Sequence, residues 1–212
     1  MRDRFVITGS SRCGTTWMSR ALTQAGVPCG HEEVFHPGEV VWPDHLQADS
    51  SWLAATKLDQ VDVPVVLMVR HPLAVVRSLV EIGFFAEWDQ DNPGHSPLRT
   101  AFPSVYDWAT PQDRALEMWL ALTTAVLGRA ELVIRLEGMD TERFSRLLRW
   151  CGAIRPESGA AVALQEPPCN RHEESRQRTG VVHQPSWGAH NPILAGCAQE
   201  LATTLGYMIE GE

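Results

Sequence analysis

The stretch "GSSRCGTTW" (9–17) follows directly on the apolar run "RFVIT" (4–8). The β-branched run predicts a buried first strand, and the apolar positions after the glycine turn recur at the spacing of a helix. Backbone N–H groups of a glycine-containing turn that begins a helix form a concave anion site. Because Arg12 adds a cation and Thr15 and Thr16 add hydroxyl donors, the stretch predicts a phosphate-binding loop.

Strand and helix patterns alternate along the rest of the chain. The continuous apolar run at 63–69 predicts a central parallel strand, and 72–83 predicts a helix with a proline in its first turn. Further elements are expected at 114–129 (helix), 131–137 (strand), 141–152 (helix) and 191–207 (helix). This alternation predicts a single α/β domain over residues 1–212, with a three-layer P-loop-like fold whose mostly parallel sheet is flanked by helices.

Composition narrows the classes of protein. The net charge of −8 argues against a nucleic-acid-binding surface spread over the molecule. The longest apolar runs are far shorter than the ~20 residues of a membrane span, and a strand starts too early for a signal sequence. Five cysteines without a CxxC pair indicate reduced thiols, so we expect a cytoplasmic protein with neither a membrane nor a nucleic-acid partner.

Two segments depart from the regular pattern. Residues 84–113 contain four prolines and five aromatic residues besides Tyr106, which predicts a lid or substrate-binding excursion. Residues 167–188 are polar, with a basic middle, and are expected to form a loop. Which residues of this second segment touch a ligand is left open.

The loop lacks a feature of nucleotide triphosphate sites. Thr15 stands where a Walker-type loop has its lysine, and no aspartate is obviously placed to bind Mg²⁺. Transfer of a γ-phosphoryl group normally needs both. A sulfuryl group carries a single negative charge, so side-chain cations can neutralise its transfer without a metal.

Two motifs in this order resemble those of sulfotransferases that use 3′-phosphoadenosine 5′-phosphosulfate (PAPS). "SRCGTTW" resembles the family's 5′-phosphosulfate loop, and "VVLMVRHPLAVVRS" resembles the strand and helix that hold the 3′-phosphate. The resemblance implies a cofactor site made of Ser10, Ser11, Arg12, Cys13, Gly14, Thr15, Thr16, Trp17, Arg70 and Ser78. His71 stands where the family has an aspartate, so Arg70 is expected to lack its orienting acid.

The resemblance also implies the catalytic residues. Arg12 takes the position of the catalytic Lys or Arg, and Lys57, the only lysine of the chain, is expected to reach the transferred sulfuryl oxygens. "CGHEEVFHP" (29–37) resembles the "CGEET" segment of tyrosylprotein sulfotransferases, which makes Glu33 the expected general base. His31 shifts that alignment by one residue. The rival bases are Glu32, His31 and His36; the spacing of Cys29, His31 and His36 fits no closed zinc site.

The sequence therefore predicts an enzyme that moves a sulfuryl group from PAPS to a hydroxyl without a metal ion, and that releases adenosine 3′,5′-bisphosphate (PAP) as the second product. The resemblance extends to bacterial carbohydrate and small-molecule sulfotransferases, so the acceptor is expected to be a small molecule or a carbohydrate. Two alternatives are a metal-dependent P-loop small-molecule kinase and a non-catalytic nucleotide-binding protein. Oligomeric state and acceptor identity are left open.

Overall fold

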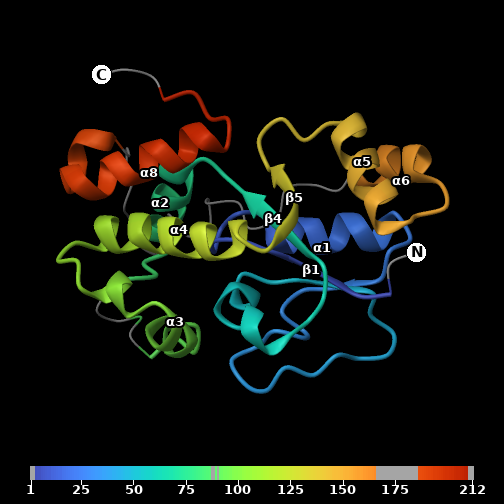
Figure 1. Cartoon of the computed structure of the whole chain (residues 1–212), viewed down its shortest axis with the longest axis horizontal. Coiled ribbons are helices and arrows are strands. Elements are labelled where there is room, and N and C mark those ends of the chain that lie inside the picture. Colours follow the sequence, from blue (N-terminus) through green and yellow to red (C-terminus); the bar gives the residue numbers. More distant parts are fainter. Residues whose placement is uncertain (1–2, 87–88, 90, 166–185, 210–212) are drawn as a thin grey trace.

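A five-stranded, all-parallel sheet in the order β2-β3-β1-β4-β5 forms the centre of the fold (Figure 1). The strands are β1 (Phe5–Thr8), β2 (Cys29–Gly30), β3 (Ala48–Ser50), β4 (Val65–Val69) and β5 (Ala130–Arg135). The computed structural model describes residues 3–86, 89, 91–165 and 186–209. Its architecture confirms the expected α/β class.

Helices cover both faces of the sheet. Helices α1 (Thr15–Gln24), α5 (Thr141–Cys151) and α6 (Pro156–Ala163) pack together, and α2 (Pro72–Glu81), α4 (Pro111–Leu127) and α8 (Pro192–Thr204) form a second group. The first group contacts the sheet through α1 and β3, and the second through α4 and β4. Figure 1 shows the two groups separated by the strands, which gives the three-layer arrangement.

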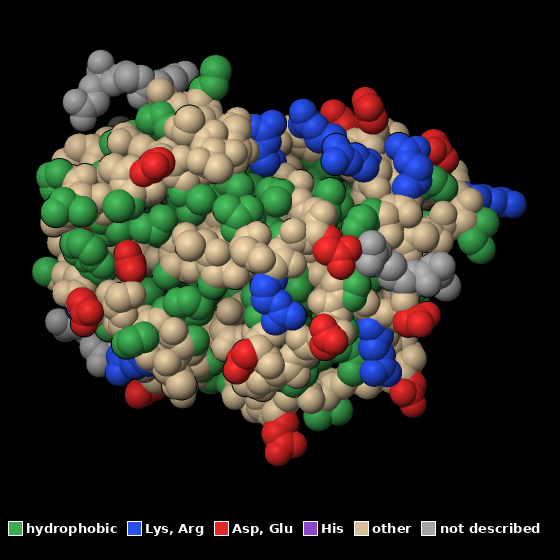
Figure 2. Space-filling model, in the orientation of Figure 1, with side chains coloured by type: hydrophobic (Ala, Val, Ile, Leu, Met, Phe, Trp, Pro, Cys, Tyr) green, Lys and Arg blue, Asp and Glu red, His purple; other side chains and the backbone are tan. Residues whose placement is uncertain are grey.

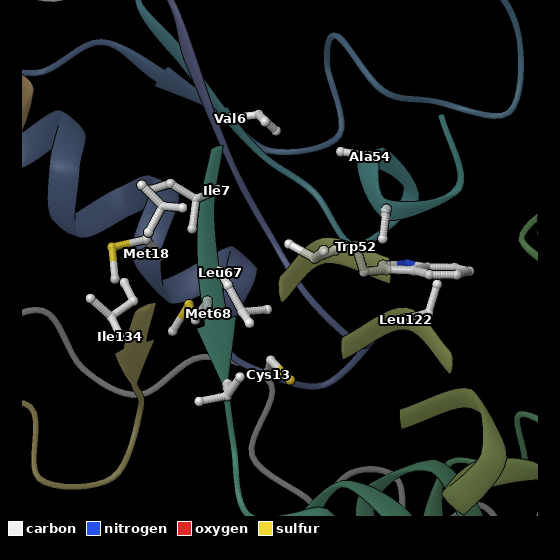
Figure 3. Close-up of a cluster of buried hydrophobic side chains, with 14 of the residues drawn as sticks. Val6, Ile7, Cys13, Met18, Trp52, Ala54, Leu67, Met68, Leu122 and Ile134 are labelled. Atoms are coloured by element: carbon white, nitrogen blue, oxygen red, sulfur yellow. The ribbon is translucent and has the colours of Figure 1, made fainter. Parts of the chain in front are cut away.

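The hydrophobic core lies on both faces of the central strands. Every residue of β1 and β4 is buried, as expected for parallel strands covered on both sides. Figure 3 shows Ile7 with Met18 and Ile134 on one side of β4, and Trp52 with Leu122 on the other. The strands are thereby held rigidly, and the loops at their carboxyl ends start from fixed positions.

Several elements differ from the expected ones. The short strand β3 and helix α6 were not expected, and α4 begins at Pro111 because Thr110 caps it by accepting a hydrogen bond from the N–H of Asp113 (3.0 Å). The segment at 84–113 contains a further helix, α3 (His95–Ala101), and a 3₁₀ turn, η4 (Pro103–Tyr106). Part of this segment is therefore regular and packed; its role as a lid stays a prediction.

Candidate functional site

A cavity of ≈ 920 Å³ runs along the carboxyl edge of the sheet. Parallel α/β sheets bind their ligands at this edge. Its lining follows the strand order, with residues that come after β2, β3, β1, β4 and β5 in turn. The lining residues are Ser11, Arg12, Gly14, Thr15, Thr16, Trp17, His31, Glu32, Pro37, Trp52, Leu53, Arg70, Ile82, Phe84, Asn92, Pro93, Gly94, Leu136, Met139 and Leu164.

The glycine turn after β1 is shaped by close packing against β4. A Cβ at Gly9 would lie 2.1 Å from the carbonyl oxygen of Met68, so only glycine fits there. Arg12 and Gly14 both have positive φ, 68° and 95°, which folds the turn back on itself. Gly14 is the N-cap of α1 and has no side chain to cap it, so the first N–H groups of the helix are available to an anion.

Two segments far apart in the sequence meet beside this turn. Arg12 donates a hydrogen bond from Nε to Oγ of Ser78 (2.7 Å), and Arg70 donates from Nη1 to the carbonyl oxygen of Arg12 (3.2 Å). Burial, and secondarily the neighbouring Arg70, lower the pKa of Arg12. Two guanidinium groups are thus held together at the start of a helix, an arrangement that favours a bound anion.

Arg70 has an acidic neighbour that the sequence analysis did not find. Oε1 of Glu137, just after β5, lies 4.0 Å from Nε of Arg70 and accepts the backbone N–H of His71 (2.9 Å). Oε2 of Glu137 accepts a hydrogen bond from the hydroxyl of Tyr207 (3.0 Å). The family's aspartate at position 71 is absent, as the sequence shows, but an acid that follows the neighbouring strand β5 lies beside Arg70.

His31 is oriented by two hydrogen bonds. Its Nδ1 lies 2.8 Å from the carbonyl oxygen of Ser50, and its Nε2 lies 2.9 Å from Oγ1 of Thr16. A carbonyl oxygen can only accept, so Nδ1 carries the proton and Nε2 of the neutral ring accepts from the hydroxyl of Thr16. The basic nitrogen of His31 therefore faces the phosphate-binding turn and lines the cavity.

The two glutamates after His31 lie differently. Glu32 lines the cavity with a φ of 58°, and burial raises its pKa, partly offset by His31. Glu33 is exposed and is not among the lining residues.

The carboxylate of Asp49 accepts two backbone hydrogen bonds from this segment. The N–H of Glu33 donates to Oδ1 of Asp49 (3.2 Å), and the N–H of Phe35 donates to Oδ2 (3.3 Å). The segment thus wraps around Asp49, which the sequence analysis did not single out; burial raises the pKa of this carboxyl to about 6 despite the N–H donors.

The other predicted residues divide into lining and buried positions. Lys57 is buried and donates from Nζ to the carbonyl oxygens of His36 and Gly38, and burial lowers its pKa. Lys57 does not line the cavity. In this structure its two hydrogen bonds hold the loop after β2. Ser10, Cys13 and Ser78 are fully buried beneath the lining, and burial raises the pKa of the Cys13 thiol to about 12.

A second cavity of ≈ 510 Å³ lies along β5 and is lined by Arg135, Arg143 and Arg146 above apolar side chains. Figure 2 shows basic side chains gathered over this part of the molecule, and they are arginines because the only lysine of the chain, Lys57, is buried elsewhere. None of the predicted site residues lines it. The candidate site is therefore the larger cavity.

No three His, Cys, Asp or Glu side chains within the described residues are grouped so that they could hold a metal ion. No described helix is both long enough and apolar enough to span a membrane. The chain matches no family model, no curated protein and no solved structure. Of the segment 167–188, for which a loop is expected and the ligand contacts are left open, only residues 186–188 are described.

Proposed function

We propose that this protein is a sulfotransferase that moves a sulfuryl group from PAPS to a hydroxyl of a small-molecule or carbohydrate acceptor. One observation carries the proposal: Nε of Arg12 lies 2.7 Å from Oγ of Ser78, which joins the two motifs beside the start of α1. Arg70 stands next to them. Such a pair of cations suits a donor with anionic groups at both its 5′ and 3′ positions.

The transfer balances as one displacement at sulfur. The acceptor oxygen forms a bond to sulfur while the bond between sulfur and the bridging phosphate oxygen breaks, and PAP leaves with the electron pair. Arg12 would stabilise the negative charge that grows on the leaving oxygen, because a fixed cation in a partly desolvated site is already oriented for it. The acceptor's proton passes to a general base.

Glu33 is the base implied by the resemblance, and it stays a prediction. The lining of the cavity supports His31 as its strongest rival, since Nε2 of His31 carries a lone pair beside the phosphate-binding turn. Glu32 also lines the cavity. A bound anion would compete for the single hydroxyl proton of Thr16, and that competition would free Nε2 for the acceptor.

The test is transfer from ³⁵S-labelled PAPS to compounds in an extract of the host cell, with and without a metal chelator. The proposal expects a labelled product that forms equally in both. Transfer from ATP that stops in the chelator would instead indicate a kinase, and tight binding of PAP without any transfer would indicate a nucleotide-binding protein.

A panel of Glu33→Gln, Glu32→Gln, His31→Gln and His36→Gln then assigns the base. Loss of the base should lower kcat by roughly 10²–10⁴ while binding of PAP is nearly unchanged. If Glu33→Gln turns over normally and His31→Gln does not, the base is His31.

A further inference from the structure

One end of the large cavity has an apolar wall. We call it the apolar wing: Pro37, Trp52, Leu53, Ile82, Phe84 and Pro93. The ring of Trp52 meets that of Phe84 edge to face, with centroids 6.0 Å apart and planes at 85°. A Cβ at Gly94 would lie 2.9 Å from Cζ2 of Trp52, so the turn at 92–94 packs directly on the indole. The wall is therefore formed before any ligand arrives.

Polar groups are concentrated at the other end of this wing. Asn92 lines the cavity, but its Nδ2 donates to Oδ1 of Asp89 (3.2 Å) and its Oδ1 accepts the N–H of Gly94 (2.9 Å). One N–H of the amide and its carbonyl oxygen are thus engaged within the turn, which leaves a single N–H donor of Asn92 for a ligand. Among the described residues, the other polar side chains that line the cavity belong to the phosphate-binding turn and the start of α1 or follow β2 and β4: Ser11, Arg12, Thr15, Thr16, His31, Glu32 and Arg70.

The opposite end of the cavity suits the nucleotide. Arg70 follows β4, and Leu136 and Met139 follow β5, whereas Pro37, Trp52 and Leu53 of the apolar wing follow β2 and β3, on the other side of β1 in the strand order. Phe84 belongs to the wing through its contact with Trp52. If Arg70 holds the 3′-phosphate, as the proposed function requires, the nucleoside occupies this end. The apolar wing is then the space that remains for the acceptor.

We infer, resting on the proposed function, that the acceptor is a largely apolar molecule with a hydroxyl at one end, such as a phenol or a hydrophobic alcohol, rather than a carbohydrate. The apolar body would lie against Trp52 and Phe84, and the hydroxyl would point to His31 and Arg12. A sugar carries hydroxyl groups on every side, and on this wall most of them would lose water without gaining a partner. Selectivity for the apolar compound should therefore be at least about tenfold.

The experiment compares 2-naphthol with N-acetylglucosamine, as ligands of the protein saturated with PAP and as acceptors of label from PAPS. Ile82→Trp fills the apolar wing, and Met139→Trp places the same side chain at the nucleotide end. We expect Ile82→Trp to weaken binding of 2-naphthol about tenfold and to leave the affinity for PAP unchanged. Met139→Trp is the matched control and should weaken the binding of PAP. Because this weakening prevents saturation with PAP, the affinity of the variant for 2-naphthol is compared with that of the native protein in the absence of nucleotide, and it should be unchanged.

The outcomes separate the inference from the proposed function. Tight binding of PAP together with transfer to N-acetylglucosamine but not to 2-naphthol would overturn the acceptor class and leave the sulfotransferase intact. Binding of 2-naphthol that responds to Met139→Trp and not to Ile82→Trp would also overturn it, because the acceptor would lie at the wrong end. Failure of the native protein to bind PAP would overturn both.

Discussion

Replacing Arg12 with methionine should weaken the binding of PAP roughly 10- to 150-fold. Methionine keeps an unbranched side chain but removes the guanidinium that lines the cavity and donates to Ser78. A hydrogen bond to a charged group contributes about 1.5–3 kcal/mol, and each 1.4 kcal/mol is a factor of ten in affinity. The expected loss follows from one such bond.

The assay is thermal unfolding with and without PAP at about 100 times the dissociation constant of the native protein. Binding then stabilises the native fold by about 2.7 kcal/mol, which for a domain of this size raises Tm by roughly 5–11 °C. For Arg12→Met the same PAP concentration is about 1–10 times the dissociation constant, so about 0.4–1.4 kcal/mol remains and Tm should rise by only roughly 1–6 °C.

The unliganded protein gives an internal check on folding. Burial and the neighbouring Arg70 lower the pKa of Arg12, which disfavours its charged form in the folded state, whereas its hydrogen bond to Ser78 favours that form. Because the two effects oppose each other, Arg12→Met without PAP should melt within about 4 °C of the native protein. Arg20→Met is the control, because Arg20 is exposed on the same helix and does not line the cavity. A full PAP-dependent shift in Arg12→Met would refute the reasoning.

Four further results are expected. Gly9→Ala should cost about 3 kcal/mol or more in unfolding free energy because its Cβ has no room, whereas Gly128→Ala, with open space around it, should stay within about 1 kcal/mol of the native protein. Asp49 should titrate near pH 6 by NMR. Because its pKa in the folded state is raised above the unfolded value, the folded state binds one more proton than the unfolded state between about pH 4 and 6. The stability of the native protein relative to Asp49→Asn should therefore fall as the pH rises through that window. Arg70→Met should weaken PAP roughly 10- to 100-fold in calorimetry and leave AMP almost unaffected, and equal losses for both ligands would argue against a 3′-phosphate contact. Peptides from 84–113 should gain protection from hydrogen exchange only when PAP and acceptor are both present, and unchanged exchange would place the acceptor elsewhere.

The strands that lie deepest were the easiest to predict. β1 and β4 are continuous apolar runs because both of their faces are covered, and the helices after them have clear periodicity. β3 could not be found in this way, since it has three residues and Asp49 is in its middle. Its place in the sheet depends on pairing with β1 and β2, and the carboxylate of Asp49 depends on N–H groups from another loop. Neither the strand pairing of β3 nor the hydrogen bonds to Asp49 produce a periodic pattern in the sequence.

The structure brings two of the sequence motifs together for a physical reason. Arg12 and Ser78 meet because each follows a strand, and β1 and β4 are neighbours that end at the same edge of the sheet. Glu137 follows β5 on the same principle, but no spacing rule could say that it, rather than position 71, would approach Arg70. The catalytic role of Lys57 stays a prediction. A single lysine in an arginine-rich chain suggested chemistry, whereas in the structure its ammonium is bound by two carbonyl oxygens of the loop after β2.

The general base cannot be chosen from residue spacing alone, because the choice depends on how the side chains are oriented. Counting residues from Arg12 selects Glu33, yet a proton acceptor is defined by where its lone pair points. For His31 that direction is set by a carbonyl oxygen of β3 on one nitrogen and by a hydroxyl of α1 on the other. These two elements lie on either side of His31 in the sequence and come together only because β3 pairs with both β2 and β1. A one-residue slip in an alignment therefore decides nothing about the base, whereas the hydrogen bond from Nδ1 to Ser50 keeps Nε2 of the imidazole directed at the site.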